Sequence, residues 1–544
     1  SGSQSDVTDA LVDTNKKVVA ATAVVNITDA AYHANTNNNS ILASNLKNIG
    51  NATSGTVTLD NAVRITGNAS DVTAALVTTD SLVVAAASGT IANVTTTVTA
   101  SQGAGYTTIN NVNATFSNGV EDSIANLTKS ATEISDDLTT ITDFDTTTDI
   151  TVDDDAFNGN NVTTVHEATK LKAIGSSTTG TVTVSNAIKV KGSQSELTAA
   201  LVTTDSLVVA ATAVVNITDA AFGGNNSATI AASDLSSIGN ATTGTVTLDN
   251  AVKVTGSQAQ IKAALLDTDT KVVAGSDNTI ASVTDAVSAA EGQAVAAANN
   301  ILGDFAGGVA DTVSNLADTT NNVISNNFSA IKTDDGNVAV NITDLAFNGN
   351  NVTTVHAAVD LSAIGNATTG TVTVDNAIKM NGTRAKLAEA LVDTDKKVVA
   401  ATAVVDITDL AFNGNNVVTV HDATDLSAIG NATSGTVTVT QAIKMRGSRS
   451  ELGDALVDTD KKVVAATAVV NITDAAFNGN NVATVHAATD LSAIGNATSG
   501  TVTVDNAIKM SGSQAEVTDA LVDTDKKVVA ATAVVNITDA AFGG

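Results

Sequence analysis

The stretch that decides the fold runs from Val398 to His421 and reads VVAATAVVDITDLAFNGNNVVTVH. A close copy runs from Val463 to His486. Aligning the later copies on their one aromatic residue gives four positions at a constant 65-residue interval: Phe347, Phe412, Phe477 and Phe542. A fixed period of this kind is typical of stacked supersecondary units that bury their apolar faces against their neighbours.

Each 65-residue repeat contains two related halves, seen in the last full copy as Val469 to Gly500 and Thr501 to Ala533. Both halves begin with a short β-branched run and continue through a turn into a helix-like stretch. VNITDA and VTVDNA can be superposed, which predicts a coil of about 32 residues. We therefore expect a β/α solenoid of about 32-residue coils within a 65-residue double repeat.

Local signals place the helices and the core. Apolar residues recur every three positions over 482–495, which predicts a short helix with Gly495 as its C-cap. Ser513 and Glu516 have the spacing of a capping box that opens a second helix. We expect the marker aromatics of the repeats, such as Phe412, to stack in one internal row.

Two related inserts interrupt the repeats. The repeats occupy residues 1–87, 150–274 and 341–544, and the inserts occupy 88–149 and 275–340. FSNGVEDSIANL from Phe116 aligns without gaps on FAGGVADTVSNL from Phe305. Because Val309, Val313 and Leu316 have helical spacing, each insert is predicted to be a helical hairpin.

Composition excludes several classes of function. Lysine plus arginine is 26 against 56 acidic residues, a formal charge of −30, which argues against binding to nucleic acid or to anionic membranes. Without cysteine, neither a disulfide framework nor a thiolate metal site can form. The longest apolar runs fall well short of the roughly 20 residues of a membrane span.

Both ends of the chain lie at the same phase of the repeat, since SGSQSDVTDA opens it and SGSQAEVTDA begins at Ser511. There is no charged-then-apolar leader. We expect a segment of a longer or processed polypeptide. Its ends are then covered by more of the same chain or by end-to-end self-association.

The recurring ITDxAFNGNN motif offers oxygen ligands at short spacing, as a hard cation such as calcium prefers. The candidate metal-binding residues are Asp344, Asn348, Asn350, Asp409, Asn413, Asn415, Asp474, Asn478 and Asn480. The alternative is that NGNN is only a turn, because the motif matches neither an EF-hand nor the calcium β-roll nonapeptide.

Four histidines each follow a marker aromatic by nine residues: His166, His356, His421 and His486. Equivalent residues two coils apart would be about 9–10 Å from one another, too far to share one metal ion. We expect solvated helix positions for them. No strained nucleophile turn or phosphate-binding loop is present, so we expect no enzymatic activity.

Repeats of the form ITDAA…L..IGNATTGTVTV, free of cysteine, resemble those of giant repetitive bacterial cell-surface proteins, especially from marine cyanobacteria. Those include S-layer and motility-associated proteins. The resemblance implies a secreted structural or adhesive role, commonly with calcium.

The expected function is therefore that of a structural extracellular protein, a filament, surface-layer or stalk component. The principal alternative is an adhesin that grips a glycan or a cell surface, through calcium or without it. TxT alternations such as that at Thr371 leave an ice-binding face as a minor alternative.

Overall fold

A computed structural model describes most of the chain. The described residues are 1–15, 18–34, 39–78, 83–159, 165–204, 208–268, 272–275, 278–349, 355–395, 398–414, 420–460, 463–479, 485–524 and 528–540.

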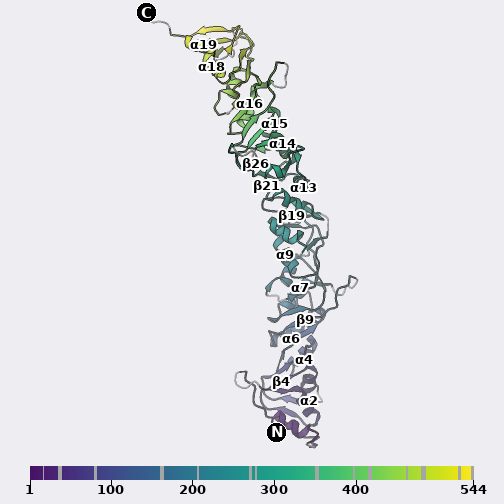
Figure 1. Ribbon diagram of the computed structural model, residues 1–544. Helices are drawn as coiled ribbons and strands as arrows, with labels where there is room; N and C mark the ends of the chain where they lie inside the picture. Colours follow the sequence, from purple (N-terminus) through teal and green to yellow (C-terminus); the bar gives the residue numbers. More distant parts are fainter. Residues whose placement is uncertain are drawn as a thin grey trace. The chain divides into compact units, whose positions relative to one another are not determined.

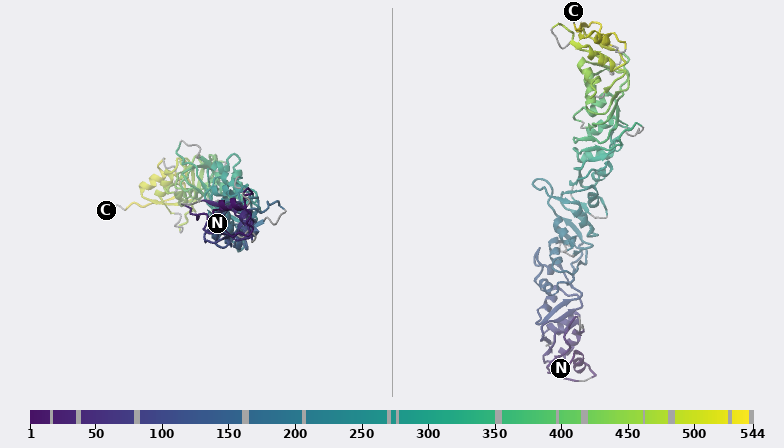
Figure 2. Two further views of the ribbon diagram at one scale, coloured as in Figure 1. Left: turned by 90° about the horizontal axis from the view of Figure 1, so that it is seen from below. Right: turned by 90° about the vertical axis from the view of Figure 1, so that its left-hand side faces the viewer.

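The chain divides into two compact units, Ser1–Ile280 and Ala281–Gly544. Each unit alternates short strands with short helices (Figures 1 and 2). Among the described residues, no helix is long and apolar enough to cross a membrane.

The first unit holds the helices α1 (Gln4–Leu11), α2 (Ala43–Asn51), α3 (Ala69–Val72), α4 (Ala100–Thr107), α5 (Ile124–Leu127), α6 (Asp136–Phe144), α7 (Ala168–Gly175), α8 (Gln194–Leu201), α9 (Ala232–Asn240) and α10 (Gln258–Ile261), with π-helical turns η1 (Thr73–Val77) and η4 (Lys262–Leu266). Its strands are β1 (Val25–Ile27), β2 (Ser40–Leu42), β3 (Val57–Leu59), β4 (Arg64–Gly67), β5 (Val83–Ala85), β6 (Thr90–Val94), β7 (Val112–Phe116), β8 (Val120–Asp122), β9 (Ile150–Val152), β10 (Val165–Glu167), β11 (Val182–Val184), β12 (Lys189–Gly192), β13 (Val208–Val209), β14 (Val214–Ile217), β15 (Thr229–Ala231), β16 (Val246–Leu248), β17 (Lys253–Gly256) and β18 (Val272–Ala274). The division between the units falls within β19 (Thr279–Val283).

The second unit holds the helices α11 (Ala289–Ala296), α12 (Val313–Leu316), α13 (Asn326–Asp334), α14 (Ala358–Ala367), α15 (Arg384–Leu391), α16 (Ala423–Asn431), α17 (Arg449–Leu456), α18 (Ala488–Asn496) and α19 (Gln514–Leu521). Its strands are β20 (Ile301–Asp304), β21 (Val309–Asp311), β22 (Ala317–Asp318), β23 (Val323–Ile324), β24 (Val340–Ile342), β25 (Val355–Ala357), β26 (Val372–Val374), β27 (Lys379–Gly382), β28 (Val398–Val399), β29 (Val404–Ile407), β30 (Val420–Asp422), β31 (Val437–Val439), β32 (Lys444–Gly447), β33 (Val463–Val464), β34 (Val469–Ile472), β35 (Val485–Ala487), β36 (Val502–Val504), β37 (Lys509–Gly512), β38 (Val528–Val529) and β39 (Val534–Ile537).

Apart from the antiparallel pair β22–β23, the sheets are short and parallel. One has the order β25-β27-β29-β31-β33, and the next, β30-β32-β34-β36-β38, has the same make-up one repeat later. Val405 pairs with Val437, which matches the expected coil of about 32 residues, but the next step, from Val437 to Val463, is shorter. The two halves of a repeat are therefore not equivalent. Both have two strands before their helix, but only one has a further strand after it, as β38 follows α19. No sheet closes on itself in the described chain.

Capping chemistry starts the helices as the sequence indicates. The Ser513 hydroxyl accepts from the Glu516 amide at 3.3 Å, and the Glu516 carboxylate accepts from the Ser513 amide at 2.8 Å, which confirms the capping box. In the other half the prediction is partly wrong. The segment before α18 forms the strand β35, and Gly495 lies buried inside the helix rather than capping it.

Neighbouring repeats are joined through buried hydroxyls. The Thr433 hydroxyl donates to the Ala403 carbonyl at 2.6 Å and accepts from the Gly435 amide at 3.0 Å. The same inter-repeat bond is made by Thr53, Thr178, Thr242, Thr368 and Thr498. These threonines satisfy carbonyls that would otherwise be buried without a partner.

The inserts are not the helical hairpins that were expected. β6 pairs in parallel with β4 and β7, and β21 pairs in parallel with β24, so both inserts continue the alternation of strands and helices. Val309 lies in a strand and only Val313 and Leu316 share a one-turn helix, so their spacing of three and four positions was misleading.

The aromatic residues are distributed differently from the prediction. Phe412 is half-buried and lies beneath the Lys444 ammonium, 5.5 Å from the ring centroid, and the other marker aromatics of the described chain make the same cation–π contact. The buried aromatics lie in the inserts instead: Tyr106, Phe116, Phe305 and Phe328. The prediction that the marker aromatics stack in one internal row is therefore wrong.

Candidate functional site

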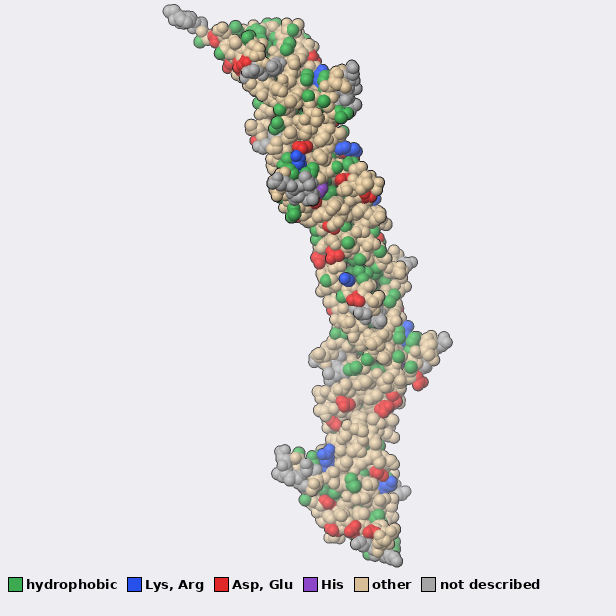
Figure 3. Space-filling view, in the orientation of Figure 1, with side chains coloured by type: hydrophobic (Ala, Val, Ile, Leu, Met, Phe, Trp, Pro, Cys, Tyr) green, Lys and Arg blue, Asp and Glu red, His purple; other side chains and the backbone are tan. Residues whose placement is uncertain are grey.

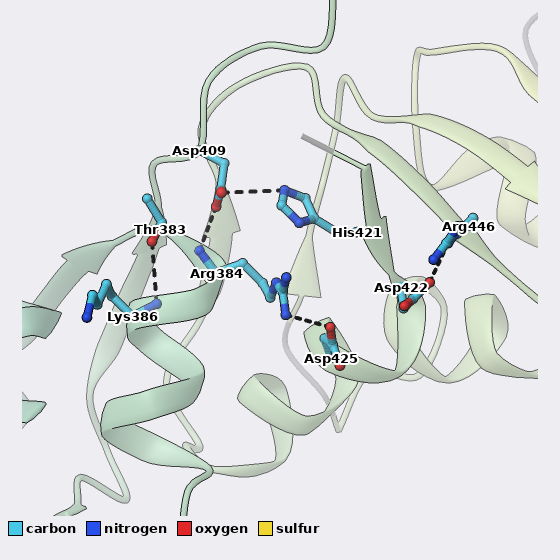
Figure 4. Close-up of polar contacts among 8 residues, drawn as sticks. All are labelled: Thr383, Arg384, Lys386, Asp409, His421, Asp422, Asp425 and Arg446. Atoms are coloured by element: carbon cyan, nitrogen blue, oxygen red, sulfur yellow. Dashed lines mark hydrogen bonds and ion pairs between the residues drawn. The ribbon is translucent and has the colours of Figure 1, made fainter. Parts of the chain in front are cut away.

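The aspartate of the ITD motif organises the most conspicuous polar cluster. Asp409 follows β29 and is 7% exposed. One of its oxygens accepts from the amide of Arg384, the first residue of α15, at 2.6 Å (Figure 4). A carboxylate at this place satisfies a helix amide that has no partner within the helix, and it complements the positive end of the helix dipole.

The contact recurs at every equivalent aspartate that the structure describes, with N–O distances of 2.5–2.9 Å. These residues are Asp29, Asp154, Asp219, Asp344, Asp474 and Asp539, which accept from the amides of Gln4, Ile124, Gln194, Val313, Arg449 and Gln514. We call all seven the ITD aspartates, although the motif reads VDD at Asp154. Each caps a helix that comes earlier in the chain: the nearest one in five cases, and α5 or α12, with α6 or α13 in between, for Asp154 and Asp344.

The histidines lie beside these aspartates. The Nε2 atom of His421 lies 3.6 Å from Asp409 Oδ1, and His356 Nε2 lies 3.2 Å from Asp344 Oδ1. His421 is 1% exposed and occupies the middle of β30, so the prediction of a solvated helix position is wrong. The alternation of a strand places this residue inward.

Burial lowers the pKa of His421, and the neighbouring Asp409 carboxylate opposes that shift. His166 and His486 show the same balance, with burial again the larger cause of the lowered pKa. These three imidazoles are therefore held in a setting that favours the neutral form.

The chain itself shows that the imidazole is optional at this position. Buried Ile41 and Ile230 occupy the middle of β2 and β15, where the other repeats have histidine. Asp29 and Asp219 still cap their helices in those repeats. The capping carboxylate is the constant part of the cluster and the histidine an addition to it.

A second carboxylate lies four positions after the histidine, and its partner varies. Asp425 binds the Arg384 guanidinium at 2.6 Å, and Asp490 binds Arg449 at 3.0 Å. Asp360 has no such arginine because α12 begins with Val313. Its side chain is 3% exposed and its Oδ1 atom has no hydrogen-bond partner among the described residues. Burial raises the pKa of this carboxyl, and the His356 charge opposes that shift.

The residues predicted to bind a cation are used in several ways. Asp344, Asp409 and Asp474 each direct one oxygen to a helix amide and the other to an imidazole. Asn348, Asn413 and Asn478 lie exposed, each before a glycine of positive φ. Asn350, Asn415 and Asn480 lie outside the described residues.

Within the described ranges, no three or more His, Asp and Glu side chains come together in a way that could hold a metal ion. A calcium site at these turns stays a prediction.

Sequence reasoning missed the capping role of the aspartate. The signal was present, because the ITD aspartate also recurs where the NGNN turn does not, as at Asp29 and Asp219. Chemically the cluster stabilises a helix end. An imidazole that is 1% exposed is closed to a substrate, although an Asp–His pair elsewhere can serve in acid–base catalysis.

No family model matches the chain, and no curated protein matches it in sequence.

Proposed function

We propose that this chain is a structural extracellular repeat protein, a component of a filament, a surface layer or a stalk. In this proposal the strands and helices of each unit form a β/α solenoid. Successive coils stack in register, so that every coil covers the apolar face of the one before it.

The observation that carries the proposal is the repetition of one inter-repeat contact. An ITD aspartate caps an earlier helix in seven places, and in six places a buried threonine donates to a carbonyl 29 or 30 residues before it. Such polar bonds hold neighbouring repeats in fixed register. The ITD aspartates and these threonines thus hold neighbouring parts of the chain together, as a structural protein that bears mechanical load requires.

The extracellular location rests on composition. The chain has no cysteine and a formal charge of −30. Figure 3 shows acidic side chains spread over the visible face rather than gathered in one patch. A surface of this kind keeps copies apart in low salt and favours contact with cations outside the cell.

An adhesin is the second candidate. Leu345 and Leu410, in equivalent positions of two repeats, are 72% and 74% exposed. Large apolar side chains that stand free at a regular interval are suited to contact with another surface.

Negative-stain microscopy of the native material, with an antibody raised against this chain, tests the proposal. We expect labelled filaments, sheets or stalks at the cell surface. Label confined to the cell interior would contradict it, and label only at sites of contact with other cells would favour the adhesin.

A further inference from the structure

The first unit contains a pocket at a place where strands cover the equivalent helix of the second unit. The pocket has a volume of about 540 Å³ and lies between the loop 129–134, α6 and α7. That volume falls within the range of roughly 300–1,000 Å³ usual for small-ligand sites. Its walls include Lys129, Glu133, Ile134, Thr169, Lys172 and Ser176.

The counterpart follows from the internal alignment, in which Leu127 matches Leu316 and His166 matches His356. Lys129 then corresponds to Asp318, and Lys172 corresponds to Ser362. In the second unit β22 and β23 pack on α14, and Ser362 is 2% exposed. In the first unit Lys172 is exposed. The helix α14 of the second unit is thus covered by strands, whereas the equivalent helix of the first unit, α7, lines an open pocket.

The open copy brings two lysines to one pocket of an acidic chain. Lys129 pairs with Asp136 at 2.8 Å, whereas the Lys172 side chain forms no ion pair with any other described residue. Thr169 and Ser176 add hydroxyl groups, and Ile134 adds an apolar surface. Two ammonium groups with hydroxyls around a small apolar patch match a ligand that has a carboxylate or sulfate, hydroxyls and C–H faces.

We propose that this pocket binds an acidic saccharide, with its carboxylate or sulfate at Lys172 and Lys129. The Glu133 carboxylate repels any anion in the pocket, but it also accepts hydrogen bonds from the hydroxyls of a sugar, which a bare sulfate lacks. The site therefore distinguishes a saccharide from inorganic sulfate or phosphate. This assignment goes beyond the structural role and is independent of it.

Titration calorimetry of the full 544-residue chain tests the assignment, with digalacturonate and a sulfated chondroitin disaccharide as acidic probes. Cellobiose and sodium sulfate are the neutral and non-saccharide probes. We expect at least one acidic disaccharide to bind with Kd at or below roughly 1 mM, and cellobiose and sulfate to bind at least about tenfold more weakly.

The matched variant is T169V/K172S, which installs the residues that the second unit carries at Val359 and Ser362. Because the second unit accommodates them, the variant should fold, and its melting curve checks that. We expect it to weaken binding at least about tenfold. Lys332→Ser, the same loss of charge on an exposed position of α13, should leave binding unchanged.

Three results would overturn the proposal. They are no binding of either acidic disaccharide at about 10 mM, equal binding of sulfate, and equal weakening by Lys332→Ser and T169V/K172S.

Discussion

At the scale of single residues, the ITD aspartates make the same helix-capping contact in seven places. Asp409 is nearly buried and accepts a hydrogen bond from the first amide of α15. Replacing it removes the acceptor and leaves the partly buried Arg384 amide without one, which costs more than the net worth of an ordinary hydrogen bond.

We expect Asp409→Ala to lower the free energy of unfolding by about 1–3 kcal/mol. Asp454→Ala is the matched control, since Asp454 is exposed on α17 and has the same charge. Urea unfolding followed by circular dichroism measures both. Equal effects of the two substitutions would contradict a capping role.

The buried histidines predict how stability responds to acid. Burial holds the pKa of His421 below its ordinary value of 6.5, so the unfolded chain takes up the proton first as the pH falls. The stability due to the neutral imidazole is complete above that value and is lost below it. His421→Ile, which copies the residue at Ile230, should therefore make the urea midpoint less sensitive between about pH 7 and pH 5.

The reverse change, Ile230→His beside Asp219, should add sensitivity to acid over the same interval. If both variants follow the parent chain at every pH, the histidines do not contribute to acid sensitivity.

At the scale of elements, the glycine of the TSG turn fixes how closely two repeats approach. A Cβ at Gly435 would collide with the Ala403 carbonyl, whereas a Cβ at Gly453, inside α17, would meet nothing within 4 Å. Gly435→Ala should therefore destabilise the chain by roughly 1–3 kcal/mol, because the backbone has to shift. Gly453→Ala should stabilise it by up to about 1 kcal/mol.

The melting temperatures of the two glycine variants can be compared directly, since both replace glycine by alanine. A gain in stability for both would mean that the repeats are not in close contact at the turn.

The elements also show what the sequence could and could not predict. The β-branched runs and the capping box at Ser513 were predictable because backbone geometry and short-range hydrogen bonds determine them. The strand at His486 was missed because it directly adjoins α18, and its apolar spacing continues that of the helix.

The inserts and the aromatic row were missed for another reason. Strand pairing of the inserts depends on partners that are distant in the sequence, as for Val94 and Phe116. A marker aromatic such as Phe412 could equally be buried or covered by a lysine, and the choice depends on the distance between repeats. For the site, spacing identified the recurring aspartate but not its partner, which lies far back in the chain at Arg384.

At the scale of the whole molecule, the charge of −30 sets its dependence on ions. We expect millimolar calcium to raise the melting temperature relative to EDTA, through the oxygen-rich turns and through relief of self-repulsion. Magnesium at the same concentration separates the two causes, because screening alone would act equally with either ion. Coincident melting curves in calcium and in EDTA would show that the stability of the chain does not depend on calcium.

The last prediction concerns assembly and starts from β39. Val535 and Ile537 are 42% and 55% exposed, whereas Val470 and Ile472, their equivalents one repeat earlier, are fully buried. Within the described chain β39 pairs only with β37. An apolar strand with a free edge is a site for pairing with another chain.

We propose that a second copy of the chain stacks end to end on this edge. Such a contact repeats without closing and yields filaments. Light scattering of the 544-residue chain should then show a mass that grows with concentration, and Val535→Lys should abolish the growth. A constant monomer mass at high concentration, with calcium and without it, would rule out end-to-end self-association.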